Sequence, residues 1–213
     1  MAKRSILFWS AAGVAALAAV IALGPAGDPA HAGSAAASPA SSPAPSPDNE
    51  RSEAVKRGEY LVRIGGCGDC HTPLRMGAQG PEPDPALTLA GHPEKLELPP
   101  PPALPAGWLY AGNATNTATA GPWGISVARN LTPDPETGLG AWSEEQFVRT
   151  IRTGRHLGIP SGRPILPPMP WQAYAHMTDE DLKAVWAYLR TVPAIRNEAP
   201  QSVPALPPAP PAN

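Results

Sequence analysis

Two cysteines and a histidine lie within five residues of one another, at Cys67, Cys70 and His71, and the chain contains no other cysteine. A Cys-x-x-Cys-His run is typical of c-type haem attachment. Two thiols one helical turn apart can each form a thioether with a haem vinyl group, and a histidine directly after the second thiol can bind the iron. We therefore predict one covalently bound haem c, with His71 as an iron ligand.

Three other interpretations of the cysteines are weaker but stay open. A zinc site needs four ligands, and the remaining candidates are scattered at His92, His156 and His176. A thiol–disulfide redox pair normally lies in a βαβ context, which this sequence lacks. A structural disulfide is sterically awkward at this spacing, although an exported protein permits one.

Haem iron needs a second axial ligand or an open position, and we expect Met169 to be that ligand. Met76 lies too close to His71 in the chain to reach the opposite side of the iron, and we expect Met177 to pack at the start of a helix. Neighbouring prolines restrict the loop around Met169, so that it can hold a weak iron–thioether bond. These prolines are Pro167, Pro168 and Pro170.

The alternatives for the second ligand are His156 and His176, with Met169 then filling a gap in the core. A histidine–methionine pair raises the haem potential and closes the iron to small molecules, which suits electron transfer. A displaceable or missing sixth ligand would instead indicate a haem enzyme or a ligand sensor.

Proline limits where the helices and strands that position these residues can form, because the chain has 31 prolines in 213 residues. Proline interrupts helices and sheet ladders, which argues against a large sheet or a long helical bundle. The three longest proline-free stretches after the N-terminus, 48–72, 136–159 and 171–192, contain helix signals. Since no strand alternation of useful length is present, we predict a mainly α fold.

Two of these helices have clear start signals. Ser143 and Gln146 form a capping box, and Thr178 caps the last helix ahead of three acidic residues, which the helix dipole favours. The last helix also has an apolar stripe at helical spacing. The stripe consists of Leu182, Val185, Trp186 and Leu189.

The N-terminus predicts export. Lys3 and Arg4 precede an uncharged apolar segment, and a small-residue cleavage site ends at Ala32, so residues 1–32 are predicted to be an export signal. Because the apolar run 6–23 approaches the length of a membrane span, residues 5–27 are alternatively an N-terminal membrane anchor. The protein is then expected in the periplasm, either soluble or tethered to the inner membrane.

Composition divides the rest of the chain into segments. Residues 33–50 are predicted to be an Ala/Ser/Pro-rich linker, 51–198 the folded domain with a long Pro/Gly-rich insertion at about 77–121, and 199–213 a disordered Pro/Ala tail. The net charge of −2, without a lysine-rich block, argues against nucleic acid as a partner.

Four segments together resemble class I c-type cytochromes, the monohaem modules found alone or as cytochrome subunits of periplasmic dehydrogenases. The resemblance covers about 51–192. Its segments are Arg57–Val62 leading into the Cys67–His71 run, Asn130–Asp134 with Thr137-Gly138 and Trp142, Pro168–Trp171, and Asp179–Leu182.

This resemblance implies a small helical fold around one covalent haem, with a redox protein such as a periplasmic dehydrogenase or respiratory complex as the partner. It implies Cys67 and Cys70 as thioether anchors, and His71 and Met169 as axial ligands. It also implies that the terminal helices cross at Gly58, against the Trp186, Tyr188 and Leu189 region. The insertion at 77–121 departs from the family pattern.

Arginines supply further candidates near the haem. Arg129 and Asn130 are candidate contacts to the haem propionates, with a purely structural role in the loop as the alternative. Arg149, Arg152 and Arg155 recur at near-helical spacing, which favours a solvated helix face. The functional interpretations are a docking surface for an acidic partner or a propionate clamp.

Overall fold

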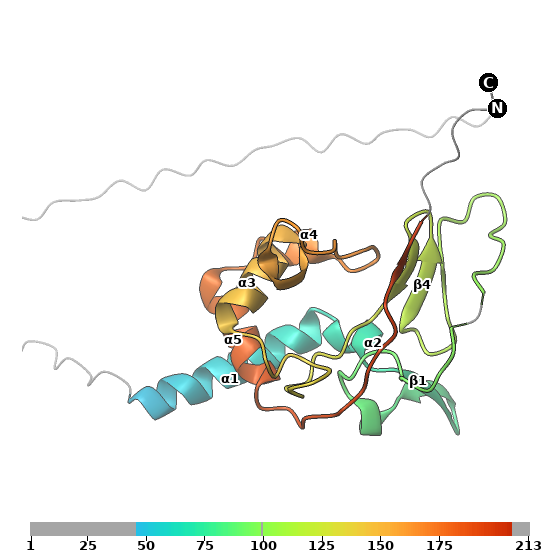
Figure 1. Ribbon diagram of the computed structural model, residues 1–213. Coiled ribbons are helices and arrows are strands. Elements are labelled where there is room, and N and C mark those ends of the chain that lie inside the picture. The colour runs from blue at the N-terminus through green and yellow to red at the C-terminus, as the bar shows by residue number, and fades with distance from the viewer. Residues whose placement is uncertain (1–45, 99, 206–213) are drawn as a thin grey trace, which may run out of the picture. The chain divides into compact units, whose positions relative to one another are not determined.

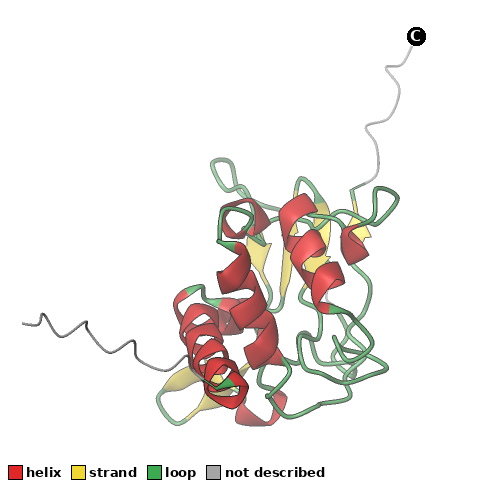
Figure 2. Cartoon of the chain, turned by 90° about the vertical axis from the view of Figure 1, so that its left-hand side faces the viewer, coloured by secondary structure: helices red, strands yellow, loops and turns green. Residues whose placement is uncertain are grey.

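The structure is a computed structural model that describes residues 46–98 and 100–205. Five α-helices and two short 3₁₀-helices lie in these residues (Figure 2). They are α1 (Pro47–Ile64), α2 (Cys67–His71), η1 (Pro85–Leu87), α3 (Glu144–Thr153), η2 (His156–Gly158), α4 (Trp171–Tyr174) and α5 (Asp179–Leu189).

Two small antiparallel sheets accompany the helices (Figure 1). A hairpin pairs the first two strands, and the other four form a sheet in the order β3-β4-β5-β6. The strands are β1 (Leu74–Gly77), β2 (Gly80–Pro83), β3 (Ala111–Gly112), β4 (Ala118–Gly121), β5 (Gly124–Val127) and β6 (Val203–Pro204).

The prediction of a mainly α fold is therefore incomplete, because it did not include the two sheets. Every strand has two to four residues, which is too short for a period-2 pattern to stand out. Strand β4 reads Ala-Thr-Ala-Gly, a composition with little strand propensity of its own. Most of the added structure lies in or beside the predicted insertion at 77–121.

Helix α1 begins earlier than the predicted domain boundary. The Ser46 side chain accepts a hydrogen bond from the Asn49 backbone N–H, and Pro47 occupies the first turn, where its missing N–H costs nothing. Residues 47–50, assigned to the linker, are thus helical. The rest of the predicted linker and the predicted export signal or anchor lie outside the described residues. Within the described residues, no helix has the length and apolar character needed to cross a membrane.

Helices α1 and α5 cross at Gly58, as predicted. A β-carbon at this position would lie 1.9 Å from the Ala184 carbonyl oxygen and 2.8 Å from the Tyr188 β-carbon. Of the predicted partners, Tyr188 is correct, and Ala184 provides the closest approach. Beside the crossing, the Arg57 guanidinium pairs with the Asp181 carboxylate at 2.9 Å.

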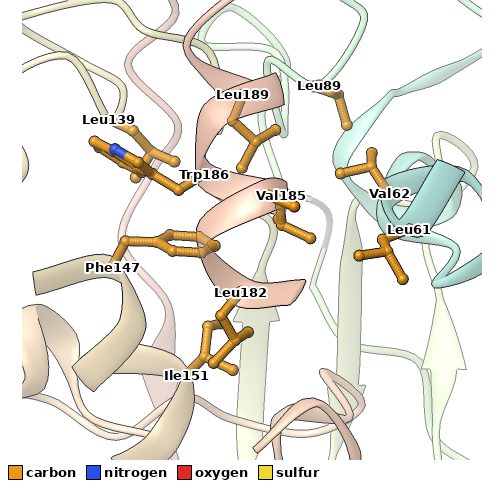
Figure 3. Close-up of a cluster of buried hydrophobic side chains, with 11 residues drawn as sticks. Leu61, Val62, Leu89, Leu139, Phe147, Ile151, Leu182, Val185, Trp186 and Leu189 are labelled. Carbon is orange, nitrogen blue, oxygen red and sulfur yellow. The ribbon is translucent and has the colours of Figure 1, made fainter. Parts of the chain in front are cut away.

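The core lies where α1, α3 and α5 meet (Figure 3). All four residues of the predicted α5 stripe are buried, with Leu182 only 1% exposed. The Phe147 ring of α3 packs 5.5 Å from the Trp186 ring of α5. The predicted capping box at Ser143 and Gln146 is present in full, and it sets the start of α3 beside this core.

Residues 195–205 form an ordered segment, which we name the C-terminal strap. Asn197 donates hydrogen bonds to the carbonyls of Ala90 and His92 at 2.7 and 2.8 Å, and β6 pairs with β5. The predicted disordered tail from Ala199 is therefore wrong for residues 199–205. Polar contacts hold this segment, so its sequence has no apolar periodicity from which its order could be predicted. Residues 206–213 lie outside the described part.

We expect Gly58→Ala to destabilise the fold by about 1–3 kcal/mol or more, the usual range for overpacking. Helix propensity alone predicts the opposite sign, a gain of about 0.5–1 kcal/mol. Urea unfolding followed by circular dichroism measures the difference.

Gly68→Ala is the matched control, because its added β-carbon would meet only the Thr72 hydroxyl at an ordinary 3.6 Å. Equal stability changes in the two variants would contradict a close crossing at Gly58.

Candidate functional site

A cavity of about 570 Å³ brings the four predicted site residues together: Cys67, Cys70, His71 and Met169 all line it. Its size falls in the range of small-molecule and cofactor sites. Apolar side chains from the core form much of its wall. They include Leu61, Leu131, Leu139, Phe147, Ile151, Leu182, Val185 and Leu189.

The His71 imidazole is held in one orientation. Its Nδ1 lies 2.7 Å from the Arg129 carbonyl oxygen, and since a carbonyl only accepts, Nδ1 carries the proton. The other nitrogen, Nε2, is left as an electron-pair donor toward the cavity, the arrangement typical of metal-binding histidines. Burial lowers the pKa of His71, while the hydrogen bond to Arg129 opposes this shift. The neutral, metal-binding form is therefore favoured.

Helix α2 presents both thiols to the cavity. It begins after Gly66, whose φ of 66° lets the chain turn sharply out of α1. The turn is further fixed by Tyr174, whose hydroxyl donates to the Gly65 carbonyl at 2.5 Å. No disulfide joins the two cysteines.

The alternative interpretations of the cysteines gain no support. Burial raises the pKa of Cys67 to about 11 and also raises the pKa of Cys70. A thiol–disulfide exchange site needs the opposite, a lowered thiol pKa. For zinc, residues 46–98 and 100–205 contain no group of three or more His, Cys, Asp or Glu side chains placed to hold a metal ion.

Met169 enters the cavity from the proline-flanked loop before α4 and packs against the core. Met177 and His156 also line the cavity, so the geometry alone leaves Met169 as a prediction. His176 is not among the lining residues. Met76 is 77% exposed on β1 and is not among the lining residues either.

Two guanidinium groups reach the cavity, from Arg129 and Arg163. Burial lowers the pKa of both. The Glu198 carboxylate, 3.7 Å from the Arg129 guanidinium, opposes this shift at Arg129, whereas repulsion from Arg129 lowers the pKa of Arg163 further. An anionic group between them would relieve this penalty on the charged forms. Arg129 was a sequence candidate, whereas Arg163 was missed because its loop has no periodic pattern.

Asn130 builds a loop instead of presenting a free polar group. Its Oδ1 accepts from the Thr132 backbone N–H at 2.9 Å, and its amide donates to the Ile195 carbonyl at 2.7 Å. Farther along, the Asp134 carboxylate accepts from the Thr137 backbone N–H and hydroxyl, each at 2.7 Å. This network shapes residues 130–138, part of which walls the cavity.

The arginines of the α3 region act on loops. Arg149 donates to the Gly158 carbonyl, Arg152 to the Ala175 carbonyl and Arg155 to the Gly162 carbonyl. None of the three lines the cavity. The geometry therefore favours a structural role over a propionate clamp, and it ties the segments on either side of Met169 to α3.

The residues present fit a haem. Two thiols and an oriented imidazole lie on one short helix, a thioether enters from a separate loop, and apolar side chains form the wall between them. The paired guanidiniums suit the two carboxylates that a haem carries. Such a donor set could bind haem iron through nitrogen and sulfur, and its two thiols could attach the ring covalently.

Comparison with known proteins agrees with this chemistry. The family model for cytochrome c matches residues 55–193. The chain is 39% identical over 88 residues to a nicotinate dehydrogenase subunit of Pseudomonas putida, covering 41% of this chain and 7% of that protein.

Two further relatives are cytochrome subunits. The gluconate 2-dehydrogenase cytochrome c subunit of Pantoea cypripedii is 32% identical over 142 residues, covering 66% of this chain and 24% of that protein. The cytochrome c subunit of the quinone alcohol dehydrogenase of Gluconobacter oxydans is 29% identical over 150 residues, covering 68% and 23%. The chain thus matches less than a quarter of the length of each of these three proteins.

We expect the cavity-wall loop to make the fold acid-sensitive through Asp134. Hydrogen bonds from Thr137 hold the pKa of Asp134 below its ordinary 3.8. The resulting stabilisation is present above pH 3.8 and is lost as the pH falls through the lowered pKa.

The free energy of urea unfolding should therefore fall more steeply from pH 5 to pH 2 in the native chain than in Asp134→Asn. The exposed Asp48→Asn serves as the control and should retain the native slope. Parallel curves for the native chain and Asp134→Asn would show that the Thr137 contacts do not favour the carboxylate.

Proposed function

The chain belongs to the cytochrome c family, and on this premise we propose that it is an exported monohaem cytochrome c that transfers single electrons between redox proteins of the periplasm or membrane. One observation carries the proposal: a single cavity gathers the chain's only Cys-x-x-Cys-His run, Met169 and two arginines. With one such run, the chain can attach one haem.

A haem bound here would supply a one-electron iron couple. The chain's own residues keep that couple in place. Cys67 and Cys70 would hold the ring through thioethers. The Arg129 carbonyl engages His71 Nδ1 and leaves Nε2 free to bind the iron, and Met169 would supply the second iron ligand. The apolar wall limits water, which favours the less charged state of the site.

Arg129 and Arg163 would hold the propionates of a haem bound here. Each guanidinium can form bidentate hydrogen bonds with a carboxylate. Arg129 also donates to the carbonyls of Ala199 and Pro200. Its position is therefore fixed by the C-terminal strap before any anion binds.

The partners are redox proteins, with a dehydrogenase as electron donor. Two relatives are named as cytochrome subunits of dehydrogenases, which supports an electron carrier in preference to a catalytic subunit. Export follows from Lys3, Arg4 and the apolar segment after them. The mature protein is periplasmic, either cleaved near Ala32 or tethered to the inner membrane through residues 5–27.

The native chain, produced with the cytochrome c maturation machinery, should retain haem on a denaturing gel. Cys67→Ser combined with Cys70→Ser should abolish the stain, because no thiol remains for a thioether. Asp69→Asn keeps the attachment residues and should stain normally. Absence of stain in the native chain would exclude covalent haem attachment.

Replacing Met169 by Ala should lower the reduction potential by roughly 0.1–0.3 V, within the range of about 0.8 V over which axial ligands set haem potentials. The ferric absorption spectrum should change with it. Met177→Leu and His156→Phe, at the two other candidate ligands of the cavity, should leave both unchanged.

An effect confined to Met177→Leu or His156→Phe would assign the ligand to that residue. If the native protein bound carbon monoxide or cyanide as readily as Met169→Ala does, the iron would have a displaceable ligand, as in a haem enzyme or sensor.

A further inference from the structure

The four-stranded sheet and the loop before it carry no charged side chain. The chain has 16 Lys and Arg and 18 Asp and Glu, yet residues 98–128 and 199–213 contain none of them and no histidine. Strands β3, β4 and β5 come from the first of these stretches, and β6 comes from the second. We name the sheet together with residues 100–110 the neutral face.

The two surfaces of this sheet have different neighbours. Ser126 lines the large cavity, whereas Ala118, Ala120 and Ile125 line a small hollow whose other side is formed by Leu98 and the prolines 100–102. Thr119 lines both. These prolines therefore cover the side of the sheet that faces away from the cavity. In Figure 1, the loop of residues 100–110 lies on one side of the sheet, and α3 and α4 lie on the other side.

Large apolar side chains are exposed at the end of this loop. Trp108 is 70% exposed, Leu109 61% and Tyr110 47%, and Val203 of β6 is 53% exposed. Single exposed apolar residues are common on soluble proteins, but a run of three large ones on an uncharged segment marks a contact surface.

The exposed residues are held in place. A turn closes between the Pro105 carbonyl and the Trp108 N–H at 3.1 Å, with Gly107 at a φ of 90°, which is typical of a type II turn. The Tyr110 ring packs against Trp123 of the β4–β5 turn, with 5.9 Å between ring centroids. Because the loop is already ordered, contact with a partner loses little conformational entropy.

We propose that the neutral face is a membrane-contact surface, which places Trp108, Leu109 and Tyr110 among the headgroups of a bilayer. Tryptophan and tyrosine favour the membrane–water interface because their rings combine an apolar body with a polar tip. Leu109 between them supplies apolar area for the acyl boundary. Without Lys or Arg, the face fits zwitterionic headgroups and gains nothing from anionic lipid.

A bilayer fits these residues better than a protein partner does. Stable protein interfaces bury about 800 Å² on each partner and have a polar rim, whereas the exposed apolar side chains here lie on a single turn. The same chain also has the apolar run 6–23, long enough to approach a membrane span. A surface contact by the domain is compatible with that run as an anchor.

A nitroxide at position 109 tests the proposal in the full haem-loaded chain. The label is attached to the new cysteine of Leu109→Cys, because the sulfurs of Cys67 and Cys70 are bound to haem in thioethers and cannot react with it. The unsubstituted chain, treated with the label in parallel, reports any reaction at those two positions. On addition of phosphatidylcholine vesicles, the collision rate of the label with oxygen should rise relative to that with a water-soluble nickel complex, by several-fold. Met76→Cys, on an equally exposed hairpin that carries the Arg75–Glu82 ion pair, is the matched control and should not change.

The dependence of this change on lipid charge and salt separates apolar contact with the bilayer from electrostatic binding. The change at position 109 should persist in 0.5 M NaCl and should not grow when phosphatidylglycerol replaces part of the phosphatidylcholine. A label at 109 that stays as accessible to nickel as the label at 76 overturns the proposal. So does a requirement for anionic lipid, or burial of the label without vesicles as protein concentration rises, which would indicate a protein partner. The haem spectrum reports folding separately, so failure here leaves the electron-transfer proposal unaffected.

Discussion

Arg129 connects three parts of the domain that are far apart in the chain. Its backbone carbonyl accepts the Nδ1 proton of His71, which fixes the imidazole on α2. Its guanidinium binds the Ala199 and Pro200 carbonyls of the C-terminal strap and also reaches the cavity. The orientation of the proposed iron ligand and the position of one cavity wall therefore both depend on this residue.

The helices supply the frame in which this residue operates. Because Gly58 has no side chain, the α1 backbone can approach Ala184 of α5 closely, and α2 leaves the end of α1 after a turn at Gly66. Phe147 and Trp186 hold α3 against the other side of α5. Local rules of capping and packing thus place α2 opposite the loop that carries Met169, with the apolar wall between them.

The helical frame and the four lining residues Cys67, Cys70, His71 and Met169 could be predicted from the sequence because each has a local signal. Capping at Ser143, the α5 stripe and the cysteine spacing are patterns within about ten residues. The sheet lacked such a signal: its strands are short, and β6 pairs with β5 from a distant part of the chain. Arg163 and the strap were missed for the same reason, since their positions follow from backbone carbonyls and from contacts between distant segments.

The strap also bears on the order in which the domain can be assembled. Synthesis proceeds from the N-terminus, so α2 and its two thiols emerge before Arg129, and Arg129 emerges before residues 195–205. Glu198 and Ser202 of the strap line the cavity, so that wall is the last one the chain can add. Until residues 195–205 dock, the cavity lacks the wall that Glu198 and Ser202 supply. Docking of the strap adds this wall, in an order set by the direction of the chain alone.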